Sequence, residues 1–285
     1  MSAQIIDGKK ISQEIKDEVK ASVSALAAQG KQPCLAVVLV GDDPASAVYV
    51  GSKKKACEYT GIKSVSYELP SATEEAALLA LVAELNADAS VHGILVQMPL
   101  PKHMNEEKIL LAIAPEKDVD GFHPYNVGAM NIGGGTLLSC TPAGVIELLK
   151  RSSIEIAGQH CVVIGRSNIV GKPAAALLLR EHGTVTICHS RTANLAAITS
   201  QADILVAAVG KPKFVTAEMV KDGAAVIDVG VHRIDPNSKK LCGDVDYEPC
   251  AEKAAWITPV PGGVGPMTIA MLMKNCLEAY RLQNA

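Results

Sequence analysis

Aromatic side chains, excess positive charge and long apolar runs are all scarce in this sequence of 285 residues. Aromatic residues make up 3% of the chain, whereas Ala, Val, Ile and Leu are abundant. That composition is typical of α/β packing around parallel strands. The formal net charge of −3 leaves no basic face, so we expect no nucleic-acid partner. No apolar run approaches the roughly 20 residues of a membrane-spanning helix, so we expect no membrane partner.

Closely spaced metal ligands are also missing. The eight cysteines form no Cys-x-x-Cys pair, and the sequence has no His-x-x-His pair. Zinc sites usually need such spacing, so we expect no metal site. Scattered cysteines are typical of buried thiols in a reducing compartment, which predicts a cytoplasmic protein.

Helices and strands alternate along the first half of the chain. The expected strands are residues 34–40, 65–69 and 93–97, and the expected helices are residues 8–28, 45–60, 74–87 and 105–112. This alternation predicts a parallel sheet. A long irregular stretch follows over residues 115–139, and loops of that length inside a compact chain usually serve a function.

The second half begins with an expected helix over residues 141–151. The expected strands are then residues 161–164, 184–188, 204–209, 225–229 and a short one at Ile257, with helices over 172–181, 195–199, 217–221 and 269–282. Repeated β/α units predict a Rossmann-type domain. The fold class is therefore α/β with two domains, residues 1–139 plus 270–285 and residues 140–269, in which the final helix returns to the first domain.

The turn after expected strand 161–164 is the main signal for a cofactor. Gly165 ends the strand, and Lys172 and Pro173 open an apolar helix whose free N–H groups would face an anion. Gly165 and Gly171 do not have G-x-G-x-x-G spacing, so an ordinary strand-to-helix turn is the alternative. The surrounding β/α units favour a dinucleotide.

The residues after expected strand 184–188 favour NADP over NAD. His189-Ser190-Arg191-Thr192 contains no carboxylate to hold a ribose 2′-hydroxyl. The hydroxyl of Ser190 and the guanidinium of Arg191 suit a 2′-phosphate, and Arg166 could add a second positive charge. The alternative is that Arg191 is an ordinary solvated loop residue.

Candidate catalytic side chains lie on expected helix 45–60. Tyr49 and Lys53 are four residues apart and share a face, where the Tyr49 ring offers a flat platform. A desolvated lysine can act as acid or base near neutral pH, and the like charges of Lys54 and Lys55 act in the same direction as burial. The alternative is a solvated lysine-rich helix face.

Two further polar residues follow in the same half. Gln97 ends an expected strand, at the sheet edge where ligands bind, although it could simply be a strand-ending amide. Asp120 can accept two parallel hydrogen bonds, for example from a pterin, or it can serve as an Asx-turn acceptor.

Five motifs together resemble those of the bifunctional methylenetetrahydrofolate dehydrogenase/cyclohydrolase (FolD) family, in the family's order and over essentially the whole chain. They are Tyr49-x-x-x-Lys53, GILVQMPLP at residues 93–101, KDVDGF at 117–122, GRSNIVGKP at 165–173 and PGGVGPMT at 261–268. The resemblance implies NADP-dependent oxidation of 5,10-methylenetetrahydrofolate to the 5,10-methenyl form, and then hydrolysis to 10-formyltetrahydrofolate. It also implies a homodimer that acts in one-carbon metabolism.

The resemblance assigns roles to residues of both domains. Lys53 is then the catalytic residue assisted by Gln97, with Tyr49 stacking on the folate and Asp120 anchoring the pterin. The implied substrate contacts also include Pro261, Gly262 and Gly263, and the implied cofactor contacts are Gly165, Arg166, Ser167, Ser190, Arg191 and Val231. A dehydrogenase without hydrolysis, another two-domain NADP dehydrogenase and a non-catalytic binding module remain as alternatives.

We also expect one cis peptide bond near a ligand site. Tight proline turns make Leu100–Pro101 and Val260–Pro261 the two candidates.

Overall fold

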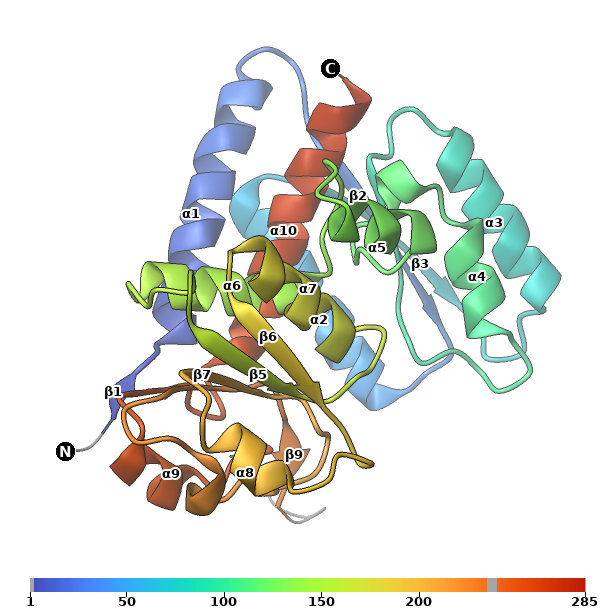
Figure 1. Ribbon diagram of the computed structural model, residues 1–285. Coiled ribbons are helices and arrows are strands. Elements are labelled where there is room, and N and C mark those ends of the chain that lie inside the picture. Colours follow the sequence, from blue (N-terminus) through green and yellow to red (C-terminus); the bar gives the residue numbers. More distant parts are fainter. Residues whose placement is uncertain (1–2, 235–239, 285) are drawn as a thin grey trace. The chain divides into compact units, whose positions relative to one another are not determined.

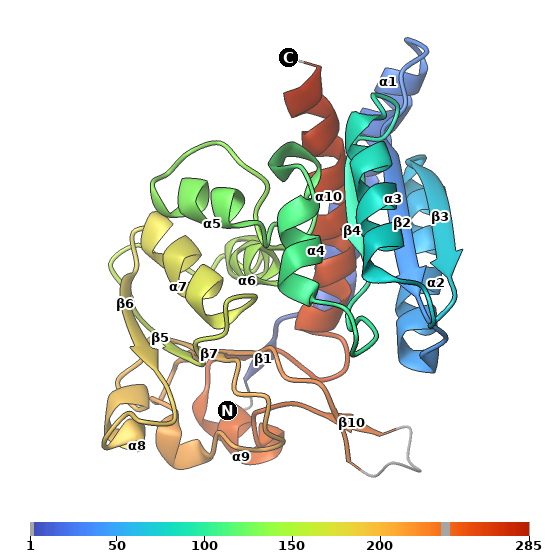
Figure 2. The ribbon, with the colours of Figure 1, turned by 90° about the vertical axis from the view of Figure 1, so that its right-hand side faces the viewer.

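The structure is a computed structural model that describes residues 3–234 and 240–284 (Figures 1 and 2). The chain folds into two compact units. The large-sheet unit comprises Met1–Ser12 and Thr141–Thr268, and the small-sheet unit comprises Gln13–Cys140 and Ile269–Ala285. Residues 1–12 thus differ from the expected division, because strand β1 (Gln4–Ile5) pairs with the large sheet.

The large sheet has six strands, and all of its pairings are parallel. After β1 they are β5 (His160–Ile164), β6 (Thr184–Cys188), β7 (Ile204–Ala207), β8 (Ala225–Asp228) and β11 (Trp256–Ile257). The spatial order is β1-β11-β8-β7-β5-β6. Connections therefore reverse direction between β5 and β7, and doubly wound folds bind ligands at the carboxyl ends of the strands at such a point.

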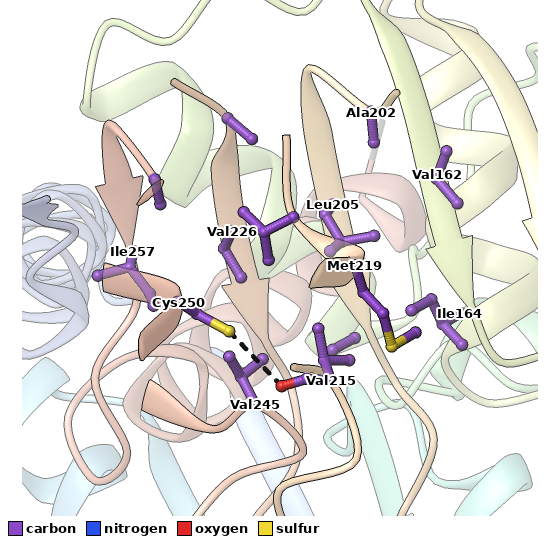
Figure 3. Close-up of a cluster of buried hydrophobic side chains, with 14 of the residues drawn as sticks. Val162, Ile164, Ala202, Leu205, Val215, Met219, Val226, Val245, Cys250 and Ile257 are labelled. Atoms are coloured by element: carbon purple, nitrogen blue, oxygen red, sulfur yellow. Dashed lines mark hydrogen bonds between the residues drawn. The ribbon is translucent and has the colours of Figure 1, made fainter. Parts of the chain in front are cut away.

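Helices and short elements complete the large-sheet unit. They are α6 (Cys140–Arg151), α7 (Gly171–Arg180), α8 (Leu195–Thr199), α9 (Tyr247–Lys253), the 3₁₀ turn η2 (Ala217–Met219) and the antiparallel strands β9 (His232–Arg233) and β10 (Leu241–Cys242). Helix α7 packs on β5 and β6. A cluster of buried side chains fills the core beside the sheet, including Leu205, Val226 and Val245 (Figure 3).

The small sheet consists of three parallel strands in the order β3-β2-β4. They are β2 (Cys34–Val40), β3 (Lys63–Leu69) and β4 (Gly93–Val96), and every residue of the central strand β2 is buried. The helical elements are α1 (Gly8–Ala27), α2 (Pro44–Thr60), α3 (Glu75–Ala87), α4 (Glu106–Ala112), η1 (Pro115–Lys117), α5 (Pro124–Asn131) and α10 (Val264–Gln283). The first residues of α1 and α10, up to Ser12 and Thr268, are assigned to the large-sheet unit.

Helix α10 completes the core of the small-sheet unit, which confirms the expected return of the final helix. A Cβ atom on Gly93 of β4 would lie 3.1 Å from the sulfur of Cys276, so strand and helix pass very close to each other. Near its end, α10 also binds the chain through Gln283 Nε2, which donates to the carbonyl of His92 at 2.8 Å.

Several elements differ from the expectations. Helix α5 lies inside the stretch 115–139 that we expected to be irregular, and α10 begins at Val264 and not at residue 269. The expectations do not include helix α9 or strand β1, and within the expected helix 217–221 only residues 217–219 are helical, as a 3₁₀ turn. The cis peptide bonds of the described residues are Met98–Pro99 and Val260–Pro261, so the second of the two candidate bonds is correct and Leu100–Pro101 is not.

Among the residues that the structure describes, no helix is both long enough and apolar enough to cross a membrane.

Candidate functional site

Lys53 and Gln97 meet in the small-sheet unit. Lys53 lies on α2 and is 9% exposed, and its Nζ donates a hydrogen bond of 2.9 Å to Oε1 of Gln97. Gln97 follows the last residue of β4, and its Nε2 donates to the carbonyl of Met98 at 2.6 Å. This second bond fixes the orientation of the amide, so an oxygen and not an NH₂ group faces the ammonium.

The three consecutive lysines of α2 have different surroundings. Lys54 forms a 3.1 Å ion pair with Glu68 of β3, and Lys55 is exposed. Only Lys53 is buried, because it lies on the face of α2 that covers the sheet. A solvated lysine-rich face, the alternative interpretation of this run, therefore describes its two neighbours and not Lys53. Tyr49 is one turn earlier on α2 and is 56% exposed, which leaves its ring free to stack on a planar ligand.

Asp120 and Asp118 are two residues apart and have different partners. Asp118 is 3% exposed and accepts hydrogen bonds from the backbone N–H of His123 at 2.7 Å and from Nδ2 of Asn126 at 3.1 Å. In the described part of the chain, the carboxylate of Asp120 accepts no such bond. The turn acceptor of this segment is therefore Asp118, and the Asp120 carboxylate remains available to a ligand.

The electrostatic surroundings connect Asp120 with Lys53. Burial raises the pKa of the Asp120 carboxyl, and the positive charge of Lys53 opposes that rise. The charge of Asp118 acts in the same direction as burial. The site thus combines three polar groups with limited exposure to water, which are the amine of Lys53, the amide of Gln97 and the carboxylate of Asp120.

The backbone on both sides of Asp120 is tightly held. Nδ2 of Asn275, on α10, donates to the carbonyl of Val119 at 2.8 Å and to that of Leu138 at 2.7 Å. Oγ of Ser139 donates to the carbonyl of Gly121 at 2.9 Å. Before this segment, the buried ammonium of Lys117 donates to the carbonyls of residues 85, 86 and 88 at the end of α3.

The large-sheet unit contains the turn that we expected to bind a cofactor. Gly165 follows β5 with φ of +129°, and a Cβ atom there would lie 2.1 Å from the carbonyl oxygen of Ala208, after β7. Only glycine can occupy this position without displacing backbone. The turn therefore lies at the reversal point between β5 and β7.

The start of α7 provides donors for an anion. The hydroxyl of Ser167 accepts hydrogen bonds from the N–H groups of Val170 at 3.1 Å and Gly171 at 3.3 Å. Over residues 3–234 and 240–284, the backbone N–H groups of residues 166–169 donate no hydrogen bond. Free N–H groups at a helix N-terminus, beside a glycine that leaves room for close approach, fit the pyrophosphate of a dinucleotide.

Ser190 and Arg191 lie on the adjacent turn. The N–H of Gly165 donates to the carbonyl of Cys188 at 2.9 Å, which links the two turns. The backbone N–H of Arg191 donates to Nδ1 of His189 at 3.2 Å, so the turn is tight and the side chains of Ser190 and Arg191 are both exposed. A hydroxyl and a guanidinium here fit a ribose 2′-phosphate.

The remaining expected contacts also lie in the large-sheet unit. Val231 is 49% exposed after β8, Pro261 is exposed, and Gly262 has φ of +111°. A Cβ atom on Gly263 would lie 2.7 Å from both the Pro259 oxygen and the Thr258 Cβ. Gly263 is thus required by the packing of the chain itself, whatever it does for a ligand.

Two family models match the chain. The catalytic domain of tetrahydrofolate dehydrogenase/cyclohydrolase matches residues 6–120, and the NAD(P)-binding domain of the same family matches residues 139–284. The chain belongs to the tetrahydrofolate dehydrogenase/cyclohydrolase family. The bifunctional protein FolD of Lachnoclostridium phytofermentans is 66% identical over 275 residues, which are 96% of this chain and 97% of that protein.

Solved structures of the tetrahydrofolate dehydrogenase/cyclohydrolase family have the same fold. The bifunctional enzyme FolD of Campylobacter jejuni is 49% identical, with a TM-score of 0.95 over 99% of each chain. The FolD of Trypanosoma brucei, solved with NADP and an inhibitor, is 40% identical, with a TM-score of 0.93 over 99% of this chain and 98% of that one.

Some residues of the site have no clear signal in the sequence. In the segment KDVDG, residues 117–121, the two aspartates have similar sequence neighbours. The sequence therefore does not distinguish Asp118, which holds the turn, from Asp120, whose carboxylate is free. Asn275 did have a signal, because it is a polar residue on the apolar side of the final helix. A buried amide inside a helix usually binds backbone groups of another segment.

Proposed function

We propose that this chain is a bifunctional enzyme of one-carbon metabolism. It oxidises 5,10-methylenetetrahydrofolate to 5,10-methenyltetrahydrofolate with NADP, and then hydrolyses that product to 10-formyltetrahydrofolate. The observation that carries the proposal is the partly buried hydrogen bond between Lys53 and Gln97, within electrostatic range of Asp120, in a chain of this family. The small-sheet unit is then the folate-binding catalytic domain, and the large-sheet unit binds NADP.

The substrate is held by side chains of the small-sheet unit. The two oxygens of Asp120 accept hydrogen bonds from the pterin edge, whose ring N–H and amino group are a matched pair of donors. The ring of Tyr49 stacks on the folate and aligns it, since this ring is exposed one turn from Lys53. Pro261, Gly262 and Gly263 add backbone contacts to the folate.

The cofactor is held by the turns after β5, β6 and β8. Gly165, Arg166 and Ser167 take the pyrophosphate, Ser190 and Arg191 take the 2′-phosphate, and Val231 contacts the nicotinamide end. When bound, NADP supplies the acceptor for the hydride that leaves the bridging carbon of the folate. The chain's contribution to oxidation is to orient the folate and to keep water from the reacting carbon.

Hydrolysis depends on proton transfer by the small-sheet unit. Water attacks the methenyl carbon, the bond from that carbon to one nitrogen breaks, and the net reaction releases one proton. The amine of Lys53 moves the proton between the attacking water and the departing nitrogen. Gln97 acts through Lys53, because its oxygen holds the Nζ atom in place. The methenyl carbon is already electrophilic, so no protein nucleophile is needed.

We further propose that the enzyme is a cytoplasmic homodimer. The eight cysteines are free thiols, and all but Cys242 are buried, which suits a reducing compartment. Strand β6 lies at one edge of the large sheet, where Ile187 is 42% exposed and Leu179 of α7 is 64% exposed. An exposed apolar strand edge is typical of pairing with another chain. Sedimentation of the purified chain, and dissociation of the dimer by Ile187→Lys, test this arrangement.

The deciding experiment measures the two reactions separately. Oxidation is followed as formation of NADPH or NADH from methylenetetrahydrofolate, with NADP and NAD in parallel. Hydrolysis is followed as loss of methenyltetrahydrofolate without any cofactor. NADPH formation without hydrolysis would indicate a dehydrogenase alone, and the absence of both reactions would indicate a binding module.

A further inference from the structure

Two buried carboxylates of the large-sheet unit have no role in the proposed chemistry. Asp228 is the last residue of β8 and is 4% exposed, and Asp244 follows β10 and has no exposed surface. Burying a carboxylate is costly unless it is hydrogen-bonded or paired. The partners of these two residues therefore indicate what the pair is for.

Asp228 joins the end of β8 to the segment that returns from β10. Its Oδ1 accepts hydrogen bonds from the N–H groups of Gly230 and Asp244, each at 2.9 Å. Its Oδ2 accepts from the N–H of Val245, also at 2.9 Å. The side chain of Val245 lies in the buried core (Figure 3), so Asp228 is tied to a fixed part of the unit.

Asp244 in turn holds the loop after β7. Its Oδ2 accepts from the N–H groups of Val209 at 2.6 Å and Gly210 at 3.0 Å, and its Oδ1 accepts from the N–H of Lys211 at 3.0 Å. Nε2 of His232 lies 2.7 Å from the same Oδ1. Because this Oδ1 already serves as an acceptor for the N–H of Lys211, we assign the His232 nitrogen as the donor.

Two glycines leave room for these carboxylates. A Cβ atom on Gly230 would lie 2.4 Å from Oδ1 of Asp244, and a Cβ atom on Gly243 would lie 1.8 Å from Oδ2 of Asp228. Each acid thus occupies space that any other residue at the glycine would fill. The cluster therefore depends both on the two acids and on the glycines opposite them, which have no side chain to occupy the same space.

The loops that this cluster holds lie where a dinucleotide binds. The loops after β7 and β8 leave the carboxyl ends of adjacent parallel strands, which is the ligand edge of a doubly wound sheet. The first of them, at Ala208, also contacts Gly165 of the phosphate turn. In the second, Val231 is exposed between Gly230 and His232, both of which are bound to the cluster.

We propose that His232, Asp244 and Asp228 are positioning residues for NADP, which hold the loops after β7 and β8 in the arrangement that receives the cofactor. This inference rests on the proposed function, because it assumes that the large-sheet unit binds NADP. None of the three residues needs to touch the cofactor. Without Asp244, the three backbone N–H groups that it binds would lose their acceptor, and the loop after β7 would no longer be held in this conformation.

The test measures NADPH binding to the full chain by the change in NADPH fluorescence, which does not depend on turnover. In His232→Leu the bond to Asp244 is lost, and we expect the dissociation constant to rise about tenfold, the effect of one charge-assisted hydrogen bond. His232→Gln keeps an N–H donor at similar reach and should bind within about threefold of the wild type. Hydrolysis of methenyltetrahydrofolate without cofactor should be unchanged in both.

A matched control is His160→Leu in the same unit. His160 is the first residue of β5, at the amino end of the strand and away from the carboxyl ends that receive the cofactor, and its Nε2 lies 3.1 Å from the hydroxyl of Thr186. This variant should bind NADPH as the wild type does. Equal weakening in His160→Leu and His232→Leu, or unchanged binding in His232→Leu, would overturn the inference. A wild-type chain that does not bind NADPH would instead overturn the proposed function, and this inference with it.

Discussion

Nζ of Lys53 and Oε1 of Gln97 are 2.9 Å apart, and their hydrogen bond joins the middle of α2 to the end of β4. The contact places the amine of a helix residue at the carboxyl edge of the small sheet. Its orientation depends on the bond from Gln97 to the carbonyl of Met98. The reactive nitrogen is thus positioned by two successive hydrogen bonds.

Replacing this amine should separate the two activities. In Lys53→Met the hydrolysis of methenyltetrahydrofolate should fall by at least about a hundredfold, because positioned proton transfer typically contributes that much. NADPH binding should be unchanged, since it depends on the other unit. Lys55→Met is the matched control, because Lys55 is exposed on the same helix and its loss should leave both activities intact. Full hydrolysis by Lys53→Met would contradict the role of Lys53.

The two acids of residues 118–120 should respond differently to the same substitution. Asp118→Ala removes the oxygen that accepts from both His123 and Asn126, so we expect a loss of about 1–3 kcal/mol in the free energy of unfolding. Asp120→Ala removes no hydrogen bond of the described fold, and we expect a KM for methylenetetrahydrofolate raised about tenfold or more with little change in Tm. Thermal unfolding and steady-state kinetics of both variants check this, and the reverse pattern would refute it.

Arg191 should determine the preference for NADP over NAD. Without its guanidinium, in Arg191→Ala, the KM for NADP should rise roughly ten- to a hundredfold, while that for NAD should change little. Arg180→Ala removes the same charge from an exposed position at the end of α7 and serves as the control. Equal effects on both cofactors, or equal effects in both variants, would mean that Arg191 does not contact the 2′-phosphate.

Asp228 should make the stability of the protein depend on pH. Burial raises the pKa of Asp228 to about 6 from its ordinary value of 3.8, and the charge of Asp244 adds to this against the opposing hydrogen bonds from Val245, Asp244 and Gly230. The folded state then binds the proton more tightly, so this group contributes stability below about pH 4 that is lost as the pH rises through about 6. A difference of about two units between the pKa in the folded and unfolded states corresponds to roughly 3 kcal/mol in the free energy of unfolding.

The measurement compares urea unfolding of the wild type and Asp228→Asn at several pH values. Relative to the variant, the wild type should gain stability as the pH is lowered from about 7.5 to about 4.5. A difference between the two proteins that stays constant over this range would show that Asp228 titrates normally.

The strands were the most predictable part of the fold. Residues 34–40 and 184–188 form strands with the expected bounds, because a short run of apolar or β-branched residues between turn residues has few other stable conformations. Helix α5 escaped prediction because it has little apolar periodicity, with only Asn126 and Met130 buried. The start of α10 was missed because its glycine and proline are typical of a loop, although proline is well tolerated in a first helical turn.

The sequence indicates candidate site residues where one residue type can do the chemistry alone. A lysine on a helix or a glycine in a turn can be recognised from its immediate sequence neighbours. The partners of a buried acid cannot, because they come from segments that are distant in the sequence. Asp228 and Asp244 are 16 residues apart in sequence and bind loops of two strands, and no local pattern indicates that contact. Gly230 and Gly243 are the local indication of a close contact, but the sequence does not show that a carboxylate lies opposite each of them.

Helix α10 has a consequence for the order in which the protein can be made. It supplies Asn275, Met273 and Cys276 to the core of a unit whose other residues all precede position 141. On the ribosome, that earlier part must wait, with an uncovered sheet face, until the whole nucleotide-binding segment has been synthesised. The segments of the large-sheet unit are thus all synthesised by Thr268, before the part of α10 that completes the half carrying Lys53, so the unit that starts second along the chain can be finished first.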